Sequence, residues 1–463
     1  MLFVLAVPLG IIAQTSLQSG DRKTGRLTSS NQEAWYTITV TQDGEASLTV
    51  TPLQNANLRQ LYLYAVVNGE NKELTWIWVD GGDGGTLTRS NLAPGTYKVR
   101  LTGYPKSNEA DATYQISYTF TAPSQPTEPE PNNTWQTAVQ LEDGKTQYAH
   151  IGYDYYDSKD TEDWYKIVVP KDGQLDLVFN CNQTYELKLA YIDFDWSNGE
   201  TYNRKSTGWY PDPSGTLTIP DAGPGTYYIK VARSSGHGGY TLRYNFTASS
   251  YGNDPADNDE WNKGSEIASG QTVQGHLGYR DASNYIDDVD WYTIQVPQDG
   301  QVDLVFDCEL KYDLKLAYVD FCWSNGETYY NRQGTGWYPN QSDTLTIDNV
   351  GVGTYYIHVT RSEGHGGYKL KYIFTPNNYR NDTEPNDELE QATQTLGNNE
   401  TLTAHLGYRD ANNKVDDYDW FRLDIDNRAA MLALNVESDT LSTLKLAYVD
   451  IIQIGRASCR ERV

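Results

Sequence analysis

The stretch Gly173-Gln-Leu-Asp-Leu-Val-Phe179 decides the fold class. Leu175, Leu177 and Phe179 stand two residues apart, so they fall on one face of a β-strand that follows an Asp-Gly turn. The same spacing recurs in residues 185–191 and again in residues 227–231. Such alternation, broken by Asp-Gly and Pro-Gly turns, predicts antiparallel strands that bury one face. The sequence therefore predicts an all-β fold.

The chain also repeats itself. A Trp-Tyr or Trp-Phe pair followed by alternating apolar residues recurs about every 128 residues, at Trp35, Trp164, Trp291 and Trp420. A Gly-Thr-Tyr motif follows at Gly95, Gly225 and Gly353. Four copies therefore begin and three finish. A segment of this length with many short strands has the size of a two-sheet sandwich, so the chain is predicted to form tandem antiparallel β-sandwich domains.

Short Pro- and Asn-rich linkers set the expected domain boundaries. The copies are expected at residues 14–122, 130–248, 249–375 and 376–453, with a Pro-rich linker at residues 123–129. Copy four stops near Asp450, before the Gly-Thr-Tyr strand, and is therefore predicted to leave its core incomplete. Residues 1–13 resemble the apolar core of a secretory signal that lacks its basic start. Residues 454–463 resemble a translated sequencing adapter and are excluded from the fold.

Charge and cysteine usage narrow the functional classes. The formal net charge of -26 disfavours nucleic acid and anionic membrane surfaces as partners. The chain has four cysteines, and Cys181 and Cys308 occupy equivalent positions in different copies, so buried free thiols are expected rather than a disulfide framework.

An ordered set of motifs supports a family resemblance. Copy two opens with Glu130-Pro-Asn-Asn-Thr-Trp135, continues with Asp160-Thr-Glu-Asp-Trp-Tyr165, and ends with Gly225-Thr-Tyr and Gly239-Tyr-Thr-Leu242. This succession resembles the bacterial pre-peptidase C-terminal domain family, which includes the collagen-binding modules of clostridial collagenases. The resemblance covers copies two and three and the first half of copy four, and copy one lacks the acidic motifs. It implies a jelly-roll-like sandwich that serves exported proteins as an accessory module.

The acidic motifs, together with the resemblance, predict Ca²⁺ sites where linker and sandwich meet. Ca²⁺ takes six to eight oxygen ligands in loose geometry, and each of these copies offers carboxylates and amides twice. Copy two offers Glu130, Asn132, Asn133, Asp160 and Asp163. Copy three offers Asn258, Asp259, Asp287 and Asp290, and copy four Glu384, Asn386, Asp387, Asp416 and Asp419. Copy three has Ala256 in place of the glutamate, so its site is expected to be weaker unless Asp257 contributes. The alternative is a set of solvated turn acids.

An aromatic hairpin is the candidate partner surface. Its residues are Trp196, Tyr202, Trp209 and Tyr210 in copy two, and Trp323, Tyr329, Trp337 and Tyr338 in copy three. Aromatic rings stack on sugars or fill pockets of protein partners. The alternative is that Trp209 and Trp337 close the end of the sandwich as core residues.

No motif predicts catalysis. The sequence has no Gly-x-Ser-x-Gly elbow, no His-Glu-x-x-His helix and no phosphate-binding loop, and its repeated His-x-Gly-Tyr motifs favour structural roles. The sequence therefore predicts a secreted or cell-surface, non-catalytic binding array that attaches to polysaccharide or protein. Two alternatives stay open: the accessory region of an exported peptidase or other hydrolase, and a pure spacer.

Overall fold

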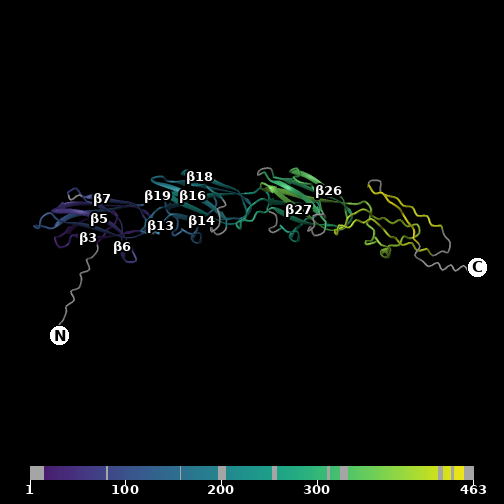
Figure 1. The fold of residues 1–463 in the computed structure, drawn as a ribbon, viewed down its shortest axis with the longest axis horizontal. Helices are drawn as coiled ribbons and strands as arrows, with labels where there is room; N and C mark the ends of the chain where they lie inside the picture. The colour runs from purple at the N-terminus through teal and green to yellow at the C-terminus, as the bar shows by residue number, and fades with distance from the viewer. Residues whose placement is uncertain are drawn as a thin grey trace, which may run out of the picture. The chain divides into compact units, whose positions relative to one another are not determined.

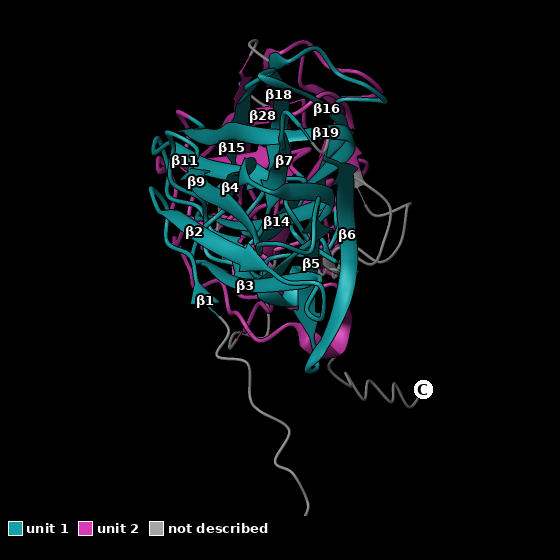
Figure 2. Cartoon of the chain, turned by 90° about the vertical axis from the view of Figure 1, so that its left-hand side faces the viewer, with its two compact units in different colours: residues 1–249, 280–285 teal, residues 250–279, 286–463 magenta. Residues whose placement is uncertain are grey.

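The structure is a computed structural model that describes residues 15–79, 82–156, 158–196, 205–252, 258–309, 313–323, 332–425, 431–438 and 443–452. Antiparallel strands dominate these residues (Figure 1). Residues 1–13 and 454–463, expected to be a leader and an adapter, lie outside them. The chain divides into two compact units, residues 1–249 with 280–285 and residues 250–279 with 286–463 (Figure 2).

Copy one forms a sandwich of two sheets in the first unit. One sheet has the strand order β1-β3-β8-β5-β6, and the other has β7-β4-β9-β2. The strands are β1 (Thr15–Ser16), β2 (Arg22–Leu27), β3 (Glu33–Val40), β4 (Gly44–Gln54), β5 (Ala56–Val67), β6 (Glu70–Trp78), β7 (Gly85–Leu92), β8 (Gly95–Pro105) and β9 (Ala112–Thr121). Two short strands of copy two, β12 (Asp154–Tyr155) and β13 (Ser158–Lys159), extend the second sheet beyond β7.

Copy two repeats this arrangement, with β19 (Gly225–Ala248) running through both sheets. In one sheet β19 pairs with β14 and β16, and in the other with β11 and β15. The remaining elements are η1 (Trp135–Thr137), β10 (Val139–Gln140), β11 (Gln147–Ile151), β14 (Glu162–Val169), β15 (Gly173–Cys181), β16 (Tyr185–Trp196), β17 (Lys205–Ser206) and β18 (Ser214–Ala222).

Copy three, in the second unit, has the sheet orders β20-β22-β27-β24-β25 and β21-β28-β23-β26. Its elements are η2 (Trp261–Lys263), β20 (Ser265–Glu266), β21 (Thr272–Leu277), β22 (Val289–Val296), β23 (Gly300–Cys308), β24 (Lys315–Cys322), β25 (Arg332–Gly334), β26 (Ser342–Val350), β27 (Gly353–Glu363) and β28 (Gly366–Pro376). The predicted fold class, tandem antiparallel β-sandwiches, is therefore confirmed.

The alternation read from the sequence becomes the core. Leu175, Leu177 and Phe179 of β15 are buried, while the residues between them reach the surface in part. Each sandwich has its own buried apolar cluster. Cys181 and Cys308 are buried free thiols, as expected, and burial raises the pKa of each to about 12.

Each core also contains a pair of tyrosines joined by their hydroxyl groups. The oxygen atoms lie 2.6 Å apart in all three sandwiches, in Tyr36–Tyr114, Tyr165–Tyr240 and Tyr292–Tyr368. A buried hydroxyl needs a hydrogen-bond partner, and each ring supplies one for the other while filling core volume. This pairing accounts for part of the high tyrosine content.

Within each unit, a loop of one copy pairs with the strand that precedes the Gly-Thr-Tyr motif of the copy before it. The paired residues, all parallel, are Asp154 with Leu92, Arg280 with Ala222, and Arg409 with Val350. The hydroxyl of Tyr227 donates to the Arg280 carbonyl at 2.8 Å. Gly223 permits this approach, because a Cβ there would lie 2.9 Å from the Arg280 backbone.

Copy four differs from the other copies in its secondary structure. Among the described residues beyond Pro376, the structure has one short helix, η3 (Leu389–Gln391), and isolated bridges, but no strand. Its apolar side chains at Met431, Leu432 and Ile451 are exposed. Strands without partners cannot bury such side chains.

We expect limited proteolysis of the chain to cut first beyond residue 380, because backbone without ladder hydrogen bonds opens at low free-energy cost. Mass spectrometry of the early fragments should recover copies one to three intact. Resistance of copy four equal to that of copy three would contradict this prediction.

Candidate functional site

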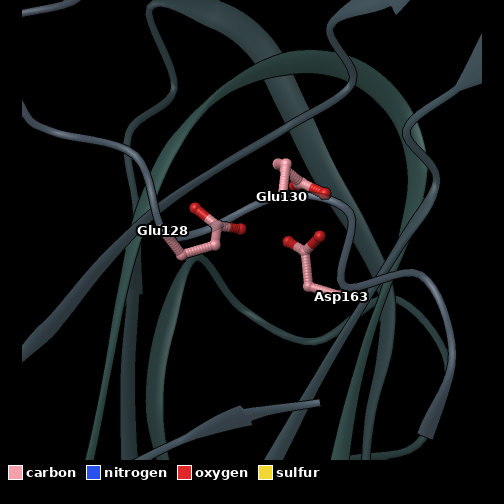
Figure 3. A group of neighbouring side chains, drawn as sticks. All are labelled: Glu128, Glu130 and Asp163. Atoms are coloured by element: carbon pink, nitrogen blue, oxygen red, sulfur yellow. The ribbon is translucent and has the colours of Figure 1, made fainter. Parts of the chain in front are cut away.

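An acidic cluster lies where the linker meets the second sandwich. Glu128 comes from the linker, Glu130 from the opening motif that follows it, and Asp163 from β14. One carboxylate oxygen of each lies within 4.8 Å of the others (Figure 3). The side chains converge from two segments that are more than thirty residues apart in the sequence. The arrangement therefore depends on how the linker is held against the strand.

A backbone hydrogen bond holds the linker in place. The amide of Trp164 donates to the carbonyl of Asn132 at 2.9 Å. The same bond recurs from Trp291 to Asn258 at 2.8 Å and from Trp420 to Asn386 at 2.9 Å. The Asn of the opening motif is thus bonded to the Trp of the Trp-Tyr or Trp-Phe pair in copies two, three and four.

Glu128 ties the cluster to a further strand. Its carboxylate accepts the backbone N–H of His150 in β11 at 2.9 Å and the hydroxyl of Thr127 at 2.9 Å. The carboxylate of Glu130 accepts the backbone N–H of Asn132 at 2.9 Å. These bonds orient both acids, so the cluster is preorganised by the backbone around it.

Burial and mutual repulsion disfavour ionisation of these acids. Burial, followed by the charges of Asp160 and Glu128, raises the pKa of Asp163 well above its usual range. Burial and the charges of Glu130 and Glu128 raise the pKa of Asp160 to about 8, and burial raises that of Glu130 to about 7. Glu128 and Asp163 are buried, Asp160 is half-buried and Glu130 is exposed, so the repulsion is strongest at the inner end of the cluster. A cation placed among the four carboxyls would offset it.

The cluster also contains oxygens that a cation would satisfy. Among the described residues, the buried oxygens Asn133 Oδ1 and Asp160 Oδ1 have no hydrogen-bond partner. Asn132 faces the same acids, and with its amide nitrogen turned toward them it donates to Glu130 Oε2 at 3.2 Å and to Asp163 Oδ1 at 3.1 Å. Carboxylate and amide oxygens are the ligands of Ca²⁺, so these residues fit that ion.

Copies three and four repeat the cluster with different members. Asp259, Asp287 and Asp290 converge in copy three, and Asp382, Glu384 and Asp419 in copy four. Burial raises the pKa of Asp416 to about 8, and Asn386, Asp416 and Asp419 each have a buried oxygen with no partner among the described residues. Asp387 pairs instead with the ammonium of Lys414. Asp257 lies outside the described residues.

Sequence reasoning missed two members of these clusters, Glu128 and Asp382. Each stands two residues before the glutamate of the opening motif, and copy three has Asp254 at the same place. An acid recurring at one position of three copies was the signal that could have identified them. Copy one has Ala34 where copies two and three have Asp163 and Asp290, which agrees with its lack of acidic motifs.

The aromatic hairpin divides into exposed and buried parts. Trp209 and Tyr210 are 73% and 67% exposed, and Trp337 and Tyr338 are 66% and 67% exposed. They are therefore surface residues and not core residues. Trp323, in contrast, is buried against Phe321, which removes it from the partner surface. Tyr202, Tyr329 and the side chain of Trp196 lie outside the described parts of the structure.

The exposed pairs, which we call the aromatic corners, have the same geometry in both copies. Trp209 packs edge-on against Tyr191 with ring centroids 5.2 Å apart, and Trp337 does so against Tyr318 at 5.4 Å. Tyr210 and Tyr338 have φ angles of 56° and 58°, a left-handed conformation that is unfavourable for a bulky residue. Their amides donate to the carbonyls of Ala190 and Ala317 at 2.7 and 2.8 Å. A shallow hollow beside Trp209 is lined by Tyr191, Asp193 and Ser206.

The histidines of the His-x-Gly-Tyr motif have structural partners. Nδ1 of His150 lies 3.2 Å from Asp43 of the Asp-Gly turn in copy one, and Nδ1 of His405 lies 3.0 Å from Asp299 of the equivalent turn in copy three. Both rings are buried. These contacts agree with the structural role that the repeated motif predicts.

Comparison with known proteins gives a limited result. No protein-family model and no curated protein matches the chain. One similar solved structure is the pre-peptidase C-terminal domain of a collagenase from Bacillus anthracis, with 16% identity, a TM-score of 0.18, and coverage of 23% of this chain and 94% of that one. Another is the CBM22-1-CBM22-2 tandem domain of Xyn10C from Paenibacillus barcinonensis, with 12% identity, a TM-score of 0.16, and coverage of 49% of this chain and 79% of that one. At these TM-scores the likenesses carry no argument on fold or function.

The described residues contain no helix long and apolar enough to span a membrane.

The repulsion in the cluster predicts an unusual pH dependence. Burial and the neighbouring acids raise the pKa of Asp160 in the folded state to about 8, from an ordinary value of 3.8. Between these pH values the folded state therefore holds a proton that the unfolded state has released. Without metal, stability should therefore fall as pH rises through this window. In the presence of chelator, Asp160→Asn should raise the melting midpoint at pH 8 by a few degrees, because it removes a carboxylate that is partly ionised there. At pH 4 the folded state already holds this carboxyl protonated, so the midpoint should change little.

Differential scanning calorimetry of the chain would measure this effect, with Asp212→Asn, an exposed acid of the same copy, as the control. The asparagine can still accept the amide hydrogen of Gly152, which Asp160 accepts at 2.9 Å. A lower midpoint at both pH values would show instead that the carboxylate stabilises the fold.

Proposed function

We propose that the chain is a non-catalytic binding array, secreted or held at a cell surface, that attaches to polysaccharide or protein through its aromatic corners. The observation that carries the proposal is the exposure of Trp209–Tyr210 and of Trp337–Tyr338 in the same geometry on two sandwiches. Large aromatic side chains left in water lose the free energy that burial would give them. A binding partner would recover it.

The backbone of the corners supports the same proposal. A tyrosine in the left-handed region costs stability unless its surroundings enforce it, and such conformations concentrate at functional sites. The hydrogen bonds to Ala190 and Ala317 hold both tyrosines there. Two copies therefore carry a strained, rigid aromatic pair on the surface, and two equal sites on one chain would bind a repetitive ligand with avidity.

We further propose that copies two, three and four each bind Ca²⁺ in the acidic clusters. The convergent oxygens, the repulsion among the acids and the unpartnered buried oxygens of copies two and four support this. The bound ion would supply positive charge that holds the linker against the first long strand. It would thereby stiffen the base of each sandwich that carries it, and copy one would fold without it.

The aromatic corners can be tested by binding. We expect the chain to be retained on at least one member of a panel of insoluble polysaccharides and matrix proteins. Trp209→Ala combined with Trp337→Ala should lower that affinity at least tenfold, because each substitution removes a stacking surface. Tyr148→Ala, at an exposed tyrosine outside the corners, is the matched control. Retention of the double variant equal to wild type would contradict the role of the corners, and a chain that binds nothing would be a spacer.

The Ca²⁺ proposal can be tested by stability. An ion that binds only the folded state raises stability by mass action, by about 2.7 kcal/mol at a concentration of 100 Kd. The melting midpoint should therefore rise in millimolar Ca²⁺ relative to chelator, and Asp163→Asn with Asp290→Asn should remove most of the rise. Asp212→Asn should keep it. Equal midpoints with and without Ca²⁺ in the wild-type chain would show that the clusters do not bind the ion.

A further inference from the structure

The first sandwich has an aromatic surface of its own, away from the hairpins. It lies on the outer face of the sheet formed by β3, β8, β5 and β6, where exposed or half-buried residues alternate with the buried residues of the core. Residues paired across the four strands form two adjacent rows. The first row is Trp35, Arg100, Tyr62 and Trp76, and the second is Glu33, Thr102, Gln60 and Trp78. We call these eight residues the aromatic face.

The rings of the aromatic face contact one another directly or through the guanidinium of Arg100. Ring centroids are 6.0 Å apart for Tyr62 and Trp76, and 5.5 Å apart for Trp76 and Trp78. The guanidinium of Arg100 lies 5.3 Å from the centroid of Tyr62 and 5.7 Å from that of Trp35. Trp76 is 40% exposed and Trp78 is 65% exposed. The row thus ends in two tryptophans that are open to solvent at the edge of the sheet.

The fold does not require these aromatic residues. The equivalent row of copy two is Trp164, Lys230, Asp193 and Ser206, and that of copy three is Trp291, His358, Asp320 and Gly334. Both sandwiches close with the same strand order although they lack the tyrosine and the second tryptophan. The tryptophans of these two rows, Trp164 and Trp291, are buried. Aromatic rings on the corresponding face of copy one therefore need a reason other than folding.

The polar groups between the rings indicate the chemistry of a ligand. Arg100 forms an ion pair with Glu33, and the indole N–H of Trp35 donates to the same carboxylate at 3.2 Å. The two charges of the face thus compensate each other on a chain whose net charge is -26. Gln60 and Thr102 add an amide and a hydroxyl. Such a face matches an uncharged partner that combines flat apolar surfaces with many hydroxyl groups.

We propose that the aromatic face binds a neutral polysaccharide whose sugar rings stack on Tyr62, Trp76 and Trp78. A pyranose ring has an apolar face of C–H groups and a rim of hydroxyls, and these complement the rings and the polar side chains in turn. Successive ring centroids of Tyr62, Trp76 and Trp78 are 6.0 and 5.5 Å apart, so the three rings give room for a short run of sugars. The proposal rests on the proposed function, since it names the ligand class of a binding array, but it uses residues that the corners do not.

The experiment separates the aromatic face from the corners. Affinity electrophoresis would be run in gels containing hydroxyethylcellulose, arabinoxylan or anionic polygalacturonate, and surface binding would be measured to gelatin. The proteins are the full chain, its Trp209→Ala/Trp337→Ala variant, the same variant with Trp76→Ala and Trp78→Ala added, and the Trp76→Ala/Trp78→Ala variant alone. Tyr148→Ala is the matched control. An unchanged melting midpoint would show that each variant folds, and Trp78→Ala alone is the milder substitution if one does not.

We expect a neutral polysaccharide to retard the corner variant, and the added Trp76→Ala and Trp78→Ala to weaken that interaction at least tenfold. Chelator should leave it unchanged, because the aromatic face lies outside the acidic clusters. Equal retardation with and without Trp76 and Trp78 would overturn this proposal while leaving the corners intact. If Trp76→Ala and Trp78→Ala abolished binding to gelatin and left polysaccharide binding unchanged, the proposal would be overturned in favour of a protein partner. Absence of all binding in the wild-type chain would refute both proposals together.

Discussion

The hydrogen bond between two buried tyrosine hydroxyls is the contact on which each sandwich depends. One ring belongs to the first long strand and the other to the last part of the chain in that sandwich, so the pair closes the two sheets over each other. In copies two and three the second hydroxyl donates onward at 2.5 Å to Asp163 or Asp290. The core and the acidic cluster are therefore one hydrogen-bonded unit. Whatever neutralises the acids also acts on the packing of the tyrosines.

The sequence was sufficient for the fold and for part of the site. Alternating apolar residues and the recurring Trp-Tyr pair predicted sandwiches, because those patterns come from local geometry. Asp160 and Asp163 were predicted because they stand directly before a strand. Glu128 was missed because its role depends on a bond to His150 in a strand some twenty residues away. Trp323 was taken for a surface residue because the hairpin pattern does not show which side of it faces the core.

The aromatic face could not be predicted from the sequence either, because its residues come together only in the folded sheet. Trp35, Tyr62, Trp76 and Arg100 come from four strands and are neighbours only through strand pairing. No window of the sequence contains all of them, so periodicity cannot reveal the row. The copies meanwhile conserve one framework and vary its surface. Copy one has aromatic rows and lacks the acidic cluster, whereas copies two and three have the cluster and the exposed corners.

The loop that pairs with the preceding copy has a consequence for how such chains evolve. Gly223 and Gly351 leave space for the backbone at Arg280 and Arg409, and the tyrosine two residues after Gly225 or Gly353 bonds to that backbone. The backbone bonds of this joint use main-chain groups and the motif tyrosine, and they recur between copies two and three and between copies three and four. The buried contacts of His150 with Asp43 and of His405 with Asp299 add side chains that also recur with the repeat. A duplicated copy would therefore carry both sides of the joint in its own sequence, and the number of copies in such an array could change without new contacts having to form.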